Sequence, residues 1–341
     1  MNTSKGQDTS GYGRRVFLAQ ASALSAAALF GLPRPAVAEP APETTKIRLV
    51  NSPAICTALE VVLVEELLRL EGFSEVEYVK WSVNSASAML ATGQVDIAMD
   101  SAPSIAFALG EGKPILALAG VHSGCYELFA SGSIQAVKEL KGKRVAISGF
   151  GSGEHVLIAS MVAYVGMDPR KDINWVIGGR DAMRLFADGK ADAYMGFAPE
   201  PQQLRAKKIG HVIVNTTQDR PWSQYFCCMV TANREFVQKY PVATKRALRA
   251  FLKAADICAN EPERVARFVV ARGYAPSYDM ALEVLKELPY RRWREASPED
   301  TLRFHALRLH EVGMIKLSPQ KLIAQGTDWR FLNELKKELK A

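Results

Sequence analysis

Two stretches of this 341-residue chain match each other at a constant spacing of 96 positions. In each stretch a helical pattern ends at a glycine, a short apolar strand containing an aspartate follows, and a proline comes just after the strand. The matched pairs are Gly93 and Gly189, Asp96 and Asp192, Met99 and Met195, Pro103 and Pro199, and Ser52 and Ser148. Chance similarity between two α/β segments is the alternative, but an ungapped run favours a duplicated β-α-β-α-β unit.

Short apolar strands alternate with helical patterns through both copies of the repeat. The strands are expected at 46–51, 76–81, 95–99 and 114–120, then at 144–148, 174–177 and 191–195. This alternation predicts an α/β fold of two lobes, each a mostly parallel sheet flanked by helices. Ligands bind beyond the carboxyl ends of such strands, so the two lobes invite one shared cleft.

The last third of the chain has a helical pattern. Helices are expected within 241–272, 278–286, 299–312 and 319–339, and a strand without a local partner precedes them at 226–232. We interpret that strand as the return of the chain to the first lobe, with the helical extension packed on that lobe.

The N-terminal segment has the three parts of a secretory signal. Arg14 and Arg15 precede an Ala/Leu-rich stretch that runs to about Phe30, and an A-x-A end follows at Ala36-Val37-Ala38. The paired arginines predict a twin-arginine signal peptide (1–38) cleaved after Ala38, followed by a linker (39–45) and a mature protein free in the periplasm. A membrane anchor is the alternative, but the apolar run is shorter than the ~20 residues needed to span a bilayer.

The net charge and the spacing of the cysteines argue against several classes of function. Residues 1–38 hold Lys5, Arg14, Arg15 and Arg34 against Asp8, so +4 of the formal +7 remains on the rest of the chain. This charge is spread out without a basic run among aromatic residues, so nucleic acid is not an expected partner. The chain has five cysteines and no C-x-x-C pair, which gives no support to a zinc ribbon or a thioredoxin-like site.

Several of these motifs resemble the nitrate/taurine/sulfonate-type periplasmic solute-binding proteins of ABC importers, to which a pyrimidine-precursor branch is similar. They are the twin-arginine leader, Ser52-Pro53 after the first strand, the G-x-x-D turns at Gly93 and Gly189, and the stretch LKGKRVAISGFGSGEHVLIASMVAYVGMDP at 140–169. The resemblance covers about 46–260. It implies the two-lobed type II periplasmic-binding-protein fold, with lobe 1 at 46–130 and 227–341, lobe 2 at 131–226, and crossovers near 129–133 and 225–228.

The resemblance also implies a function without catalysis. The expected protein is a monomer that closes around a small molecule, without a cofactor, and delivers it to an ABC permease in the inner membrane. One alternative is a sensor that uses the same closure. Another is a pyrimidine-synthase-like or other exported enzyme that uses Glu154, His155, Cys227 and Cys228.

The glycine-rich loop at 149–155 is the first candidate ligand contact. Glycine lets the backbone approach a ligand, and a helix that begins near Ser152 directs free N–H groups and partial positive charge at the cleft. An ordinary helix start capped by Ser152 is the alternative. The candidates in this loop are Gly151, Ser152, Gly153, Glu154 and His155.

The other candidates follow strands in both lobes. They are Ser52 and Pro53, Asp100 and Ser101, Phe197, Pro199 and Glu200, and more weakly His122, Trp222 and Tyr225. Asp100 either accepts from a ligand amine or caps the helix at Pro103, and Phe197 is a candidate to stack on a planar ligand. The glycine loop favours an oxyanion or carboxylate, whereas the three acidic residues argue against a bare anion such as nitrate.

Cys227 and Cys228 are adjacent in the expected return strand. The resemblance links a longer cysteine cluster near a similar crossover, in the fungal pyrimidine-synthase branch, to iron. Successive strand residues point to opposite faces, so these two are expected not to share one metal and to be buried structural thiols. No metal ligands are therefore expected.

Overall fold

The computed structural model describes residues 39–51, 55–57, 64–81 and 85–340, together with Met1. The expected signal peptide (1–38) and the candidate contacts Ser52 and Pro53 lie outside the described residues. The chain divides after Pro40, and the unit Ala41–Ala341 holds all the helices and strands named below. Among the described helices, none is long and apolar enough to cross a membrane.

The first lobe contains a parallel strand pair and a three-stranded sheet. Its strands are β1 (Lys46–Asn51), β2 (Glu75–Lys80), β3 (Ile97–Ser101), β4 (Ile115–Ser123) and β10 (Phe226–Asn233), in the orders β1-β2 and β3-β10-β4. Its helices are η1 (Ile55–Thr57), α3 (Val64–Leu70), α4 (Ala86–Ala91) and α5 (Ala102–Gly110). Strand β10 pairs antiparallel with both neighbours, so the expected return to the first lobe is confirmed.

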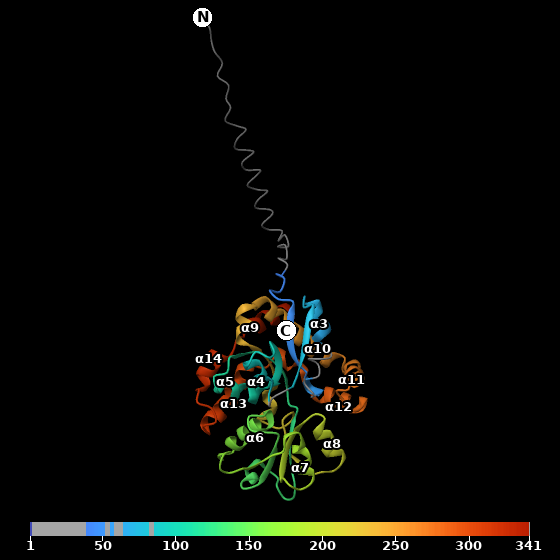
Figure 1. Cartoon of the computed structure of the whole chain (residues 1–341), viewed down its shortest axis with the longest axis vertical. Helices are drawn as coiled ribbons and strands as arrows, with labels where there is room; N and C mark the ends of the chain where they lie inside the picture. The colour runs from blue at the N-terminus through green and yellow to red at the C-terminus, as the bar shows by residue number, and fades with distance from the viewer. Residues whose placement is uncertain (2–38, 52–54, 58–63, 82–84, 341) are drawn as a thin grey trace. The chain divides into compact units, whose positions relative to one another are not determined.

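The second lobe is one five-stranded sheet, coloured green to yellow in Figure 1. Its strands are β5 (Tyr126–Ala130), β6 (Arg144–Ile147), β7 (Asn174–Ile177), β8 (Ala193–Phe197) and β9 (His211–Asn215), in the order β7-β6-β8-β5-β9. Its helices are η2 (Val137–Leu140), α6 (Gly153–Tyr164), η3 (Gly179–Asp181), α7 (Ala182–Ala187), α8 (Glu200–Ala206) and η4 (Trp222–Gln224). Each lobe therefore has one antiparallel strand delivered by a crossover, β10 in the first and β5 in the second.

The matched residues of the repeat make the same hydrogen bonds in both lobes. Arg48 donates from its backbone N (2.8 Å) and from Nη2 (2.6 Å) to Asp96, and the guanidinium also binds the Gly93 carbonyl. Arg144, 96 positions later, donates to Asp192 at 2.8 and 2.7 Å and to the Gly189 carbonyl. The repeat aspartates thus fasten the helix-ending glycine turn to the first strand, and the shared network supports the duplication.

The first crossover lies earlier in the chain than expected. We expected it near 129–133, but Tyr126–Ala130 forms β5, which pairs with β8 and β9 of the second lobe. The crossover is therefore at Gly124 and Cys125, and the boundary placed at residue 130 is wrong. All five residues of β5 are buried, so their sequence carries no sign of which sheet they join.

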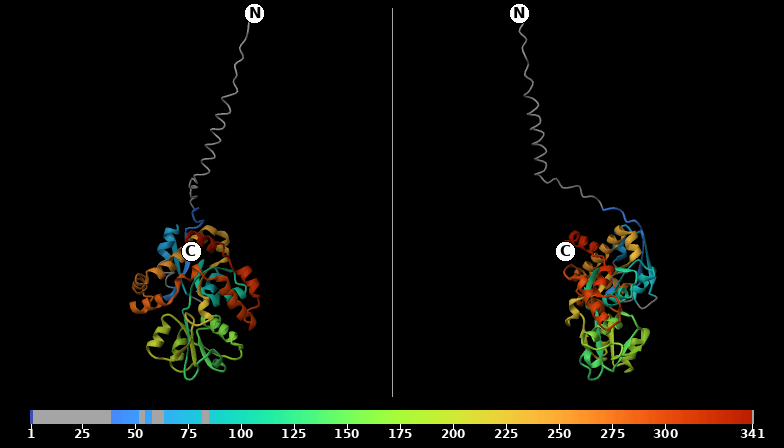
Figure 2. Two further views of the ribbon diagram at one scale, coloured as in Figure 1. Left: turned by 180° about the vertical axis from the view of Figure 1, so that it is seen from behind. Right: turned by 90° about the vertical axis from the view of Figure 1, so that its left-hand side faces the viewer.

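The C-terminal helices pack mainly on the first lobe, as expected (Figure 2). They are α9 (Arg234–Lys239), α10 (Pro241–Asn260), α11 (Pro262–Ala271), α12 (Tyr278–Glu287), η5 (Tyr290–Arg294), α13 (Pro298–Glu311), α14 (Pro319–Gly326) and α15 (Arg330–Glu338). Some of their contacts also reach the second lobe: α13 contacts α6, the α12 carboxylates bind Arg205 of α8, and Arg292 of η5 donates to the Gln224 carbonyl of η4.

Candidate ligand-binding site

Two helix N-termini, one from each lobe, meet between the lobes. Ser101 caps α5 by accepting a hydrogen bond from the Ser104 N–H (3.3 Å), and Ser152 caps α6 by accepting from the His155 N–H (3.4 Å). Ser101 is the last residue of β3, and Ser152 follows β6, so both caps lie at the carboxyl ends of strands of their lobes. The remaining first-turn N–H groups and the positive helix ends favour a negatively charged group between the two helices.

Gly153 is the point of closest approach. A Cβ atom on Gly153 would lie 2.7 Å from the Tyr126 Oη and 2.9 Å from the Ser101 Oγ. The first residue of α6 therefore lies close to α5 and β5, and a side chain at this position would displace the hydroxyl groups of Tyr126 and Ser101. Tyr126, the first residue after the crossover, thus adds a hydroxyl to this contact between the lobes.

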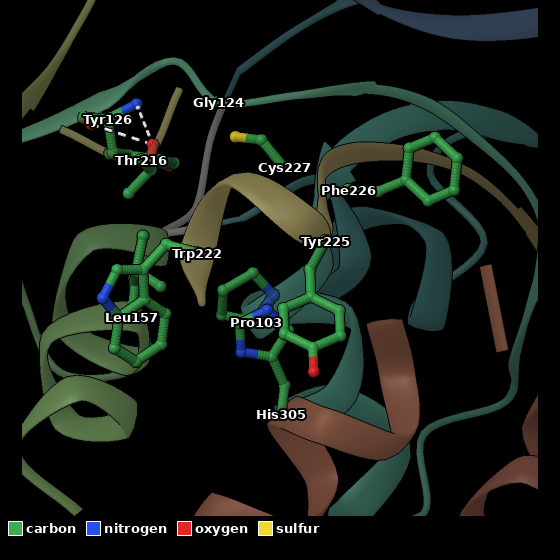
Figure 3. A pocket seen from close by; sticks show the side chains of 10 residues that line it. All are labelled: Pro103, Gly124, Tyr126, Leu157, Thr216, Trp222, Tyr225, Phe226, Cys227 and His305. Atoms are coloured by element: carbon green, nitrogen blue, oxygen red, sulfur yellow. Dashed lines mark hydrogen bonds between the residues drawn. The ribbon is translucent and has the colours of Figure 1, made fainter. Parts of the chain in front are cut away.

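A small pocket opens beside this contact (Figure 3). Its empty space is ≈ 310 Å³, part of it open to solvent, and its lining is largely aromatic and apolar. The lining residues are Pro103, Gly124, Tyr126, Leu157, Thr216, Trp222, Tyr225, Phe226, Cys227 and His305. The site thus combines hydroxyl groups and helix N-termini with a planar, apolar wall, which suits a small acidic molecule with a flat or apolar part.

The three candidate carboxylates make their hydrogen bonds within their own lobes. Asp100 accepts from Ser87 N and Oγ (both 2.7 Å) and from its neighbour's N–H. Glu154 accepts from the backbone N (2.8 Å) and the hydroxyl of Ser148, and Glu200 accepts from the Tyr194 hydroxyl (2.5 Å). Burial raises the pKa of Asp100 and of Glu200. These hydrogen bonds engage both oxygens of Asp100 and at least one oxygen each of Glu154 and Glu200, which weakens the sequence argument against a bare anion.

Asp100 accepts a hydrogen bond from the N–H of its neighbour Ser101, but it is not the cap of the helix that contains Pro103. Ser101 is the cap of α5, and the Asp100 side chain instead holds the start of α4 through Ser87. Phe197 packs edge-on against Tyr126, with ring centroids 5.7 Å apart, and Pro199 precedes α8. The Phe197 ring therefore reaches the interlobe contact, whereas Pro199 and Glu200 belong to the second lobe's own packing.

His155 holds the glycine-rich loop in place. Its Nδ1 accepts a hydrogen bond from the Gly151 N–H (3.1 Å), and its ring packs edge-on against Phe150 and Trp175. Burial lowers the pKa of His155 to about 4. The imidazole is therefore neutral at pH 7 and acts as a support of the loop.

His155 gives stability a pH dependence. In the unfolded chain His155 has a pKa near 6.5, whereas in the folded protein its pKa is about 4. Between these pH values the unfolded chain is protonated at this histidine and the folded protein is not, so lowering the pH favours unfolding. The free energy of unfolding should fall by about 3 kcal/mol from this group between those pH values. His155→Asn keeps an acceptor for Gly151 but does not titrate. Denaturant unfolding from pH 7 to 4 should show a shallower loss for the variant, and equal slopes would contradict this assignment.

His122, the weaker candidate for a ligand contact, is fully buried and is not among the residues that line the pocket. Its Nδ1 lies 3.3 Å from the Ser123 carbonyl, and its ring packs edge-on against Tyr290 of η5. Burial lowers its pKa, but the charge interactions and hydrogen bonds with Cys228 and Cys56 outweigh burial and raise the pKa to about 10. His122 therefore belongs to a cluster of cysteines.

Four of the five cysteines gather in that cluster. The Sγ atoms of Cys56, Cys125 and Cys228 all lie within 4.8 Å of one another, and the Cys227 Sγ lies 2.6 Å from the Cys125 Sγ. Burial raises the pKa of Cys227, but hydrogen bonds from Cys125 and Cys228 outweigh burial and hold it at about 7. We name Cys56, Cys125, Cys227, Cys228 and His122 the thiol cluster.

The expectation that Cys227 and Cys228 point to opposite faces is wrong. Their Sγ atoms lie 3.9 Å apart, because the pairing of β10 with β4 shifts register on both sides of Cys228. Such an irregularity breaks the alternation of a regular strand. Nothing in the sequence around Phe226–Asn233 signals it.

Sequence reasoning missed several residues of the site. Ser104, Tyr126, Thr216 and His305 come together there from four separate elements or loops. Thr216 accepts from the Tyr126 backbone N (3.0 Å) and donates to its carbonyl (2.8 Å). Ser104 could have been found from the sequence, because it directly follows Pro103 at the start of an expected helix. Tyr126 could be found only by locating the crossover.

Comparison with known proteins identifies the family. The model of the family described as "NMT1/THI5 like" matches residues 74–265. The chain belongs to the NMT1/THI5-like family. Among curated proteins, the Saccharomyces cerevisiae 4-amino-5-hydroxymethyl-2-methylpyrimidine phosphate synthases THI5 and THI12 are 25% identical over 195 residues. These matches cover 51% of this NMT1/THI5-like chain and 54% of each yeast protein, about half of either length.

Solved structures establish the fold of this family member. The periplasmic nitrate-binding protein NrtA from Synechocystis PCC 6803 superposes with a TM-score of 0.74 at 16% identity, covering 88% of this chain and 90% of that one. The alkanesulfonate-binding protein SsuA from Xanthomonas axonopodis pv. citri, bound to MOPS, gives 0.68 at 17% identity, covering 86% and 100%. The chain has the α/β periplasmic-binding-protein fold with a helical C-terminal part, as the sequence predicted.

Proposed function

We propose that this protein is the solute-binding component of an ABC importer and captures a small acidic molecule by closure of its two lobes, without catalysis. The meeting of the α5 and α6 N-termini at Gly153, Ser101 and Tyr126 carries the proposal. An anion bridging the two helices would bind both lobes at once. Because those contacts exist only when the lobes are together, the ligand would stabilise the closed form.

The chemistry of the site narrows the ligand class. The carboxylates of Asp100, Glu154 and Glu200 accept hydrogen bonds within their lobes, which offsets part of their repulsion of an anion at the cleft. Trp222, Tyr225 and Phe197 supply a flat, apolar surface nearby. An organic sulfonate, phosphate or carboxylate with a planar or apolar portion fits this combination better than a bare inorganic anion.

A ligand panel tests the proposal. Thermal shift and calorimetry should be run with nitrate, sulfate, taurine, aromatic sulfonates and carboxylates, and hydroxymethylpyrimidine with and without its phosphate. We expect one class of organic anion to raise the melting temperature and bind with a stoichiometry of one, and no compound to be converted. Absence of a shift throughout the panel, or turnover of the bound compound, would contradict a transport role.

A pyrimidine-synthase-like enzyme is the second candidate. The names of the curated yeast relatives and the thiol cluster favour it. It predicts that the purified protein forms a pyrimidine phosphate, which product analysis by mass spectrometry detects directly. We rank it second because the yeast matches cover only about half of either chain and the interlobe contact supports binding by closure.

The proposed importer role places the protein in the periplasm. The twin-arginine motif at Arg14 and Arg15 is the sequence feature that supports this location. Arg14→Lys together with Arg15→Lys should retain the uncleaved chain in the cytoplasm, because the export machinery reads the arginine pair. Fractionation and the mass of the mature N-terminus measure this result. Unchanged export of the variant would contradict export of this protein by the twin-arginine route.

A further inference from the structure

The C-terminal helix α13 contributes a histidine, His305, to the lining of the pocket. The helix packs against α5 and α6, the two helices whose N-termini meet between the lobes. Thr301, one turn before His305, accepts a hydrogen bond from the Phe226 N–H (3.1 Å) at the start of β10. Residues four apart lie on the same face of a helix, so this bond turns His305 toward the same segment. In Figure 3 the His305 side chain extends from α13 toward Pro103 and Tyr225.

The ring of His305 is buried without a complete set of hydrogen bonds. The residue is 3% exposed, and among the described residues its Nδ1 has no hydrogen-bond partner. Most buried polar groups in folded proteins have a partner, and an unpartnered one is costly because it has lost its contact with water. The lining side chains of Pro103, Leu157 and Phe226 are apolar and cannot supply a partner. A partner from outside the chain is therefore expected.

We propose that His305 is a specificity-determining residue, which forms a hydrogen bond with a polar group on the flat portion of the bound organic anion. This inference rests on the proposed function, because it assigns a role within the same site. The favoured ligand is then an aromatic anion whose ring contains a nitrogen atom or carries a hydroxyl or amino group. A ring without such a group would leave the Nδ1 of His305 unpartnered when the lobes close, and a site built to form a hydrogen bond discriminates against such a ligand.

The charge state of His305 separates its role from that of the helix N-termini. Burial lowers the pKa of His305 to about 3, so the imidazole is neutral at pH 7. A neutral imidazole has one N–H donor and one acceptor nitrogen, and it adds no positive charge to the site. The helix N-termini therefore bind the charged group of the ligand, whereas His305 binds a neutral group. Because the ring can donate or accept, both a hydroxyl group and a ring nitrogen fit.

The pocket adjoins the contact between the lobes, so one ligand can reach both. Pro103 lies in the first turn of α5 and lines the pocket. Tyr126 also lines the pocket, and its Oη is the atom that a Cβ on Gly153 would meet at 2.7 Å. The Tyr225 ring stands edge-on to the His305 ring, with centroids 6.4 Å apart. An anion at the helix N-termini can therefore extend its flat portion along this wall to His305.

A water molecule in the pocket is the rival partner for His305. Buried water commonly satisfies polar groups that have no partner in the protein. Such a water would serve His305 equally well whichever ligand is bound, whereas a direct hydrogen bond forms only with a ligand that carries the polar group. The two explanations therefore differ in how strongly the protein discriminates between ligands of the same charge and shape.

Matched pairs of ligands test this inference on the full chain. Calorimetry compares pyridinesulfonates with benzenesulfonate and hydroxybenzoates with benzoate, since the members of each pair have the same charge and nearly the same shape. In the wild type we expect the best polar member to bind at least about 10-fold more tightly than its apolar partner, equivalent to about 1.4 kcal/mol. In His305→Phe this preference should fall to within about 2-fold, because the new ring cannot form the hydrogen bond.

His305→Asn and His310→Phe are the matched controls. Asparagine places an amide near the position of the Nδ1, so His305→Asn should keep more of the preference than His305→Phe does. His310 is exposed on the same helix, so His310→Phe should keep the full preference of the wild type. If His305→Phe does not fold, the wild type and His305→Asn still decide the question.

The outcomes separate this inference from the proposed function. Equal affinities within every pair in the wild type would show that water satisfies His305, and would overturn this inference alone. An unchanged preference in His305→Phe would also overturn it, because the discrimination would then come from another residue. Absence of binding by every member of these pairs would overturn it as well, and the wider ligand panel decides separately whether the proposed function stands.

Discussion

Replacing Gly153 with leucine should lower ligand affinity by at least about 100-fold, equivalent to about 2.7 kcal/mol, while the protein stays folded. The leucine Cβ would meet the Tyr126 Oη at 2.7 Å and the Ser101 Oγ at 2.9 Å, both inside normal contact distance. The larger side chain forces α5 and α6 apart and separates the two helix N-termini from a shared anion. Calorimetry with the compound that gives the largest shift in the ligand panel measures the loss.

The stability of this variant should change little. Gly153 is the first residue of α6, and leucine is the better helix former by up to about 1 kcal/mol. Gly153→Ala should have a smaller effect on affinity, since hydroxyl-bearing side chains can move slightly. Gly142→Ala is the control for affinity. Its positive φ of +72° makes alanine strained there, but nothing lies within 4 Å of the added Cβ and the position is in a turn before β6, outside the contact, so ligand affinity should not change. Binding by Gly153→Leu within about 3-fold of wild type would exclude closure at this contact.

The duplication made the architecture predictable. Glycine turns and aspartates at matched positions marked the ends of helices and the starts of strands, and Asn174–Ile177 and Ala182–Ala187 formed as expected. The hydrogen bonds of Arg48 to Asp96 and of Arg144 to Asp192 explain why: each spans 48 positions, and the same contact occurs in both copies of the repeat. A contact that recurs in two copies leaves a sequence pattern at a constant spacing, so it can be predicted.

Contacts that occur in only one copy of the repeat, or between different parts of the fold, left no such pattern. Tyr126–Ala130 is equally buried in either sheet, so the crossover was placed too late in the chain. Asp100 and Glu154 were expected at the cleft because they follow strands, but each is held by a serine of its own lobe. The thiol cluster depends on an irregularity in β10, a property of the pairing of two strands that neither strand reveals alone.

Replacing Arg205 with methionine should destabilise the protein by about 3 kcal/mol at pH 7. Arg205 of α8 forms an ion pair with Glu127 of β5, whose side chain is only 7% exposed. Methionine leaves that carboxylate buried without its cation, and such an uncompensated charge is costly. Chemical denaturation of the variant measures the loss, and Glu127→Gln in the same chain should restore most of it by removing the charge.

Arg205 also joins the second lobe to the C-terminal helices. Its Nη2 lies 2.9 Å from Glu283 and 3.5 Å from Glu287, both on α12. Arg170→Met is the control, since the exposed pair of Arg170 with Asp168 should contribute no more than about 1 kcal/mol. If Arg205 helps hold the lobes together, Arg205→Met with Glu127→Gln should bind ligand more weakly even where stability is recovered. Full recovery of both properties would assign Arg205 to the packing of the second lobe alone, because the double variant restores that packing and still lacks the link to α12.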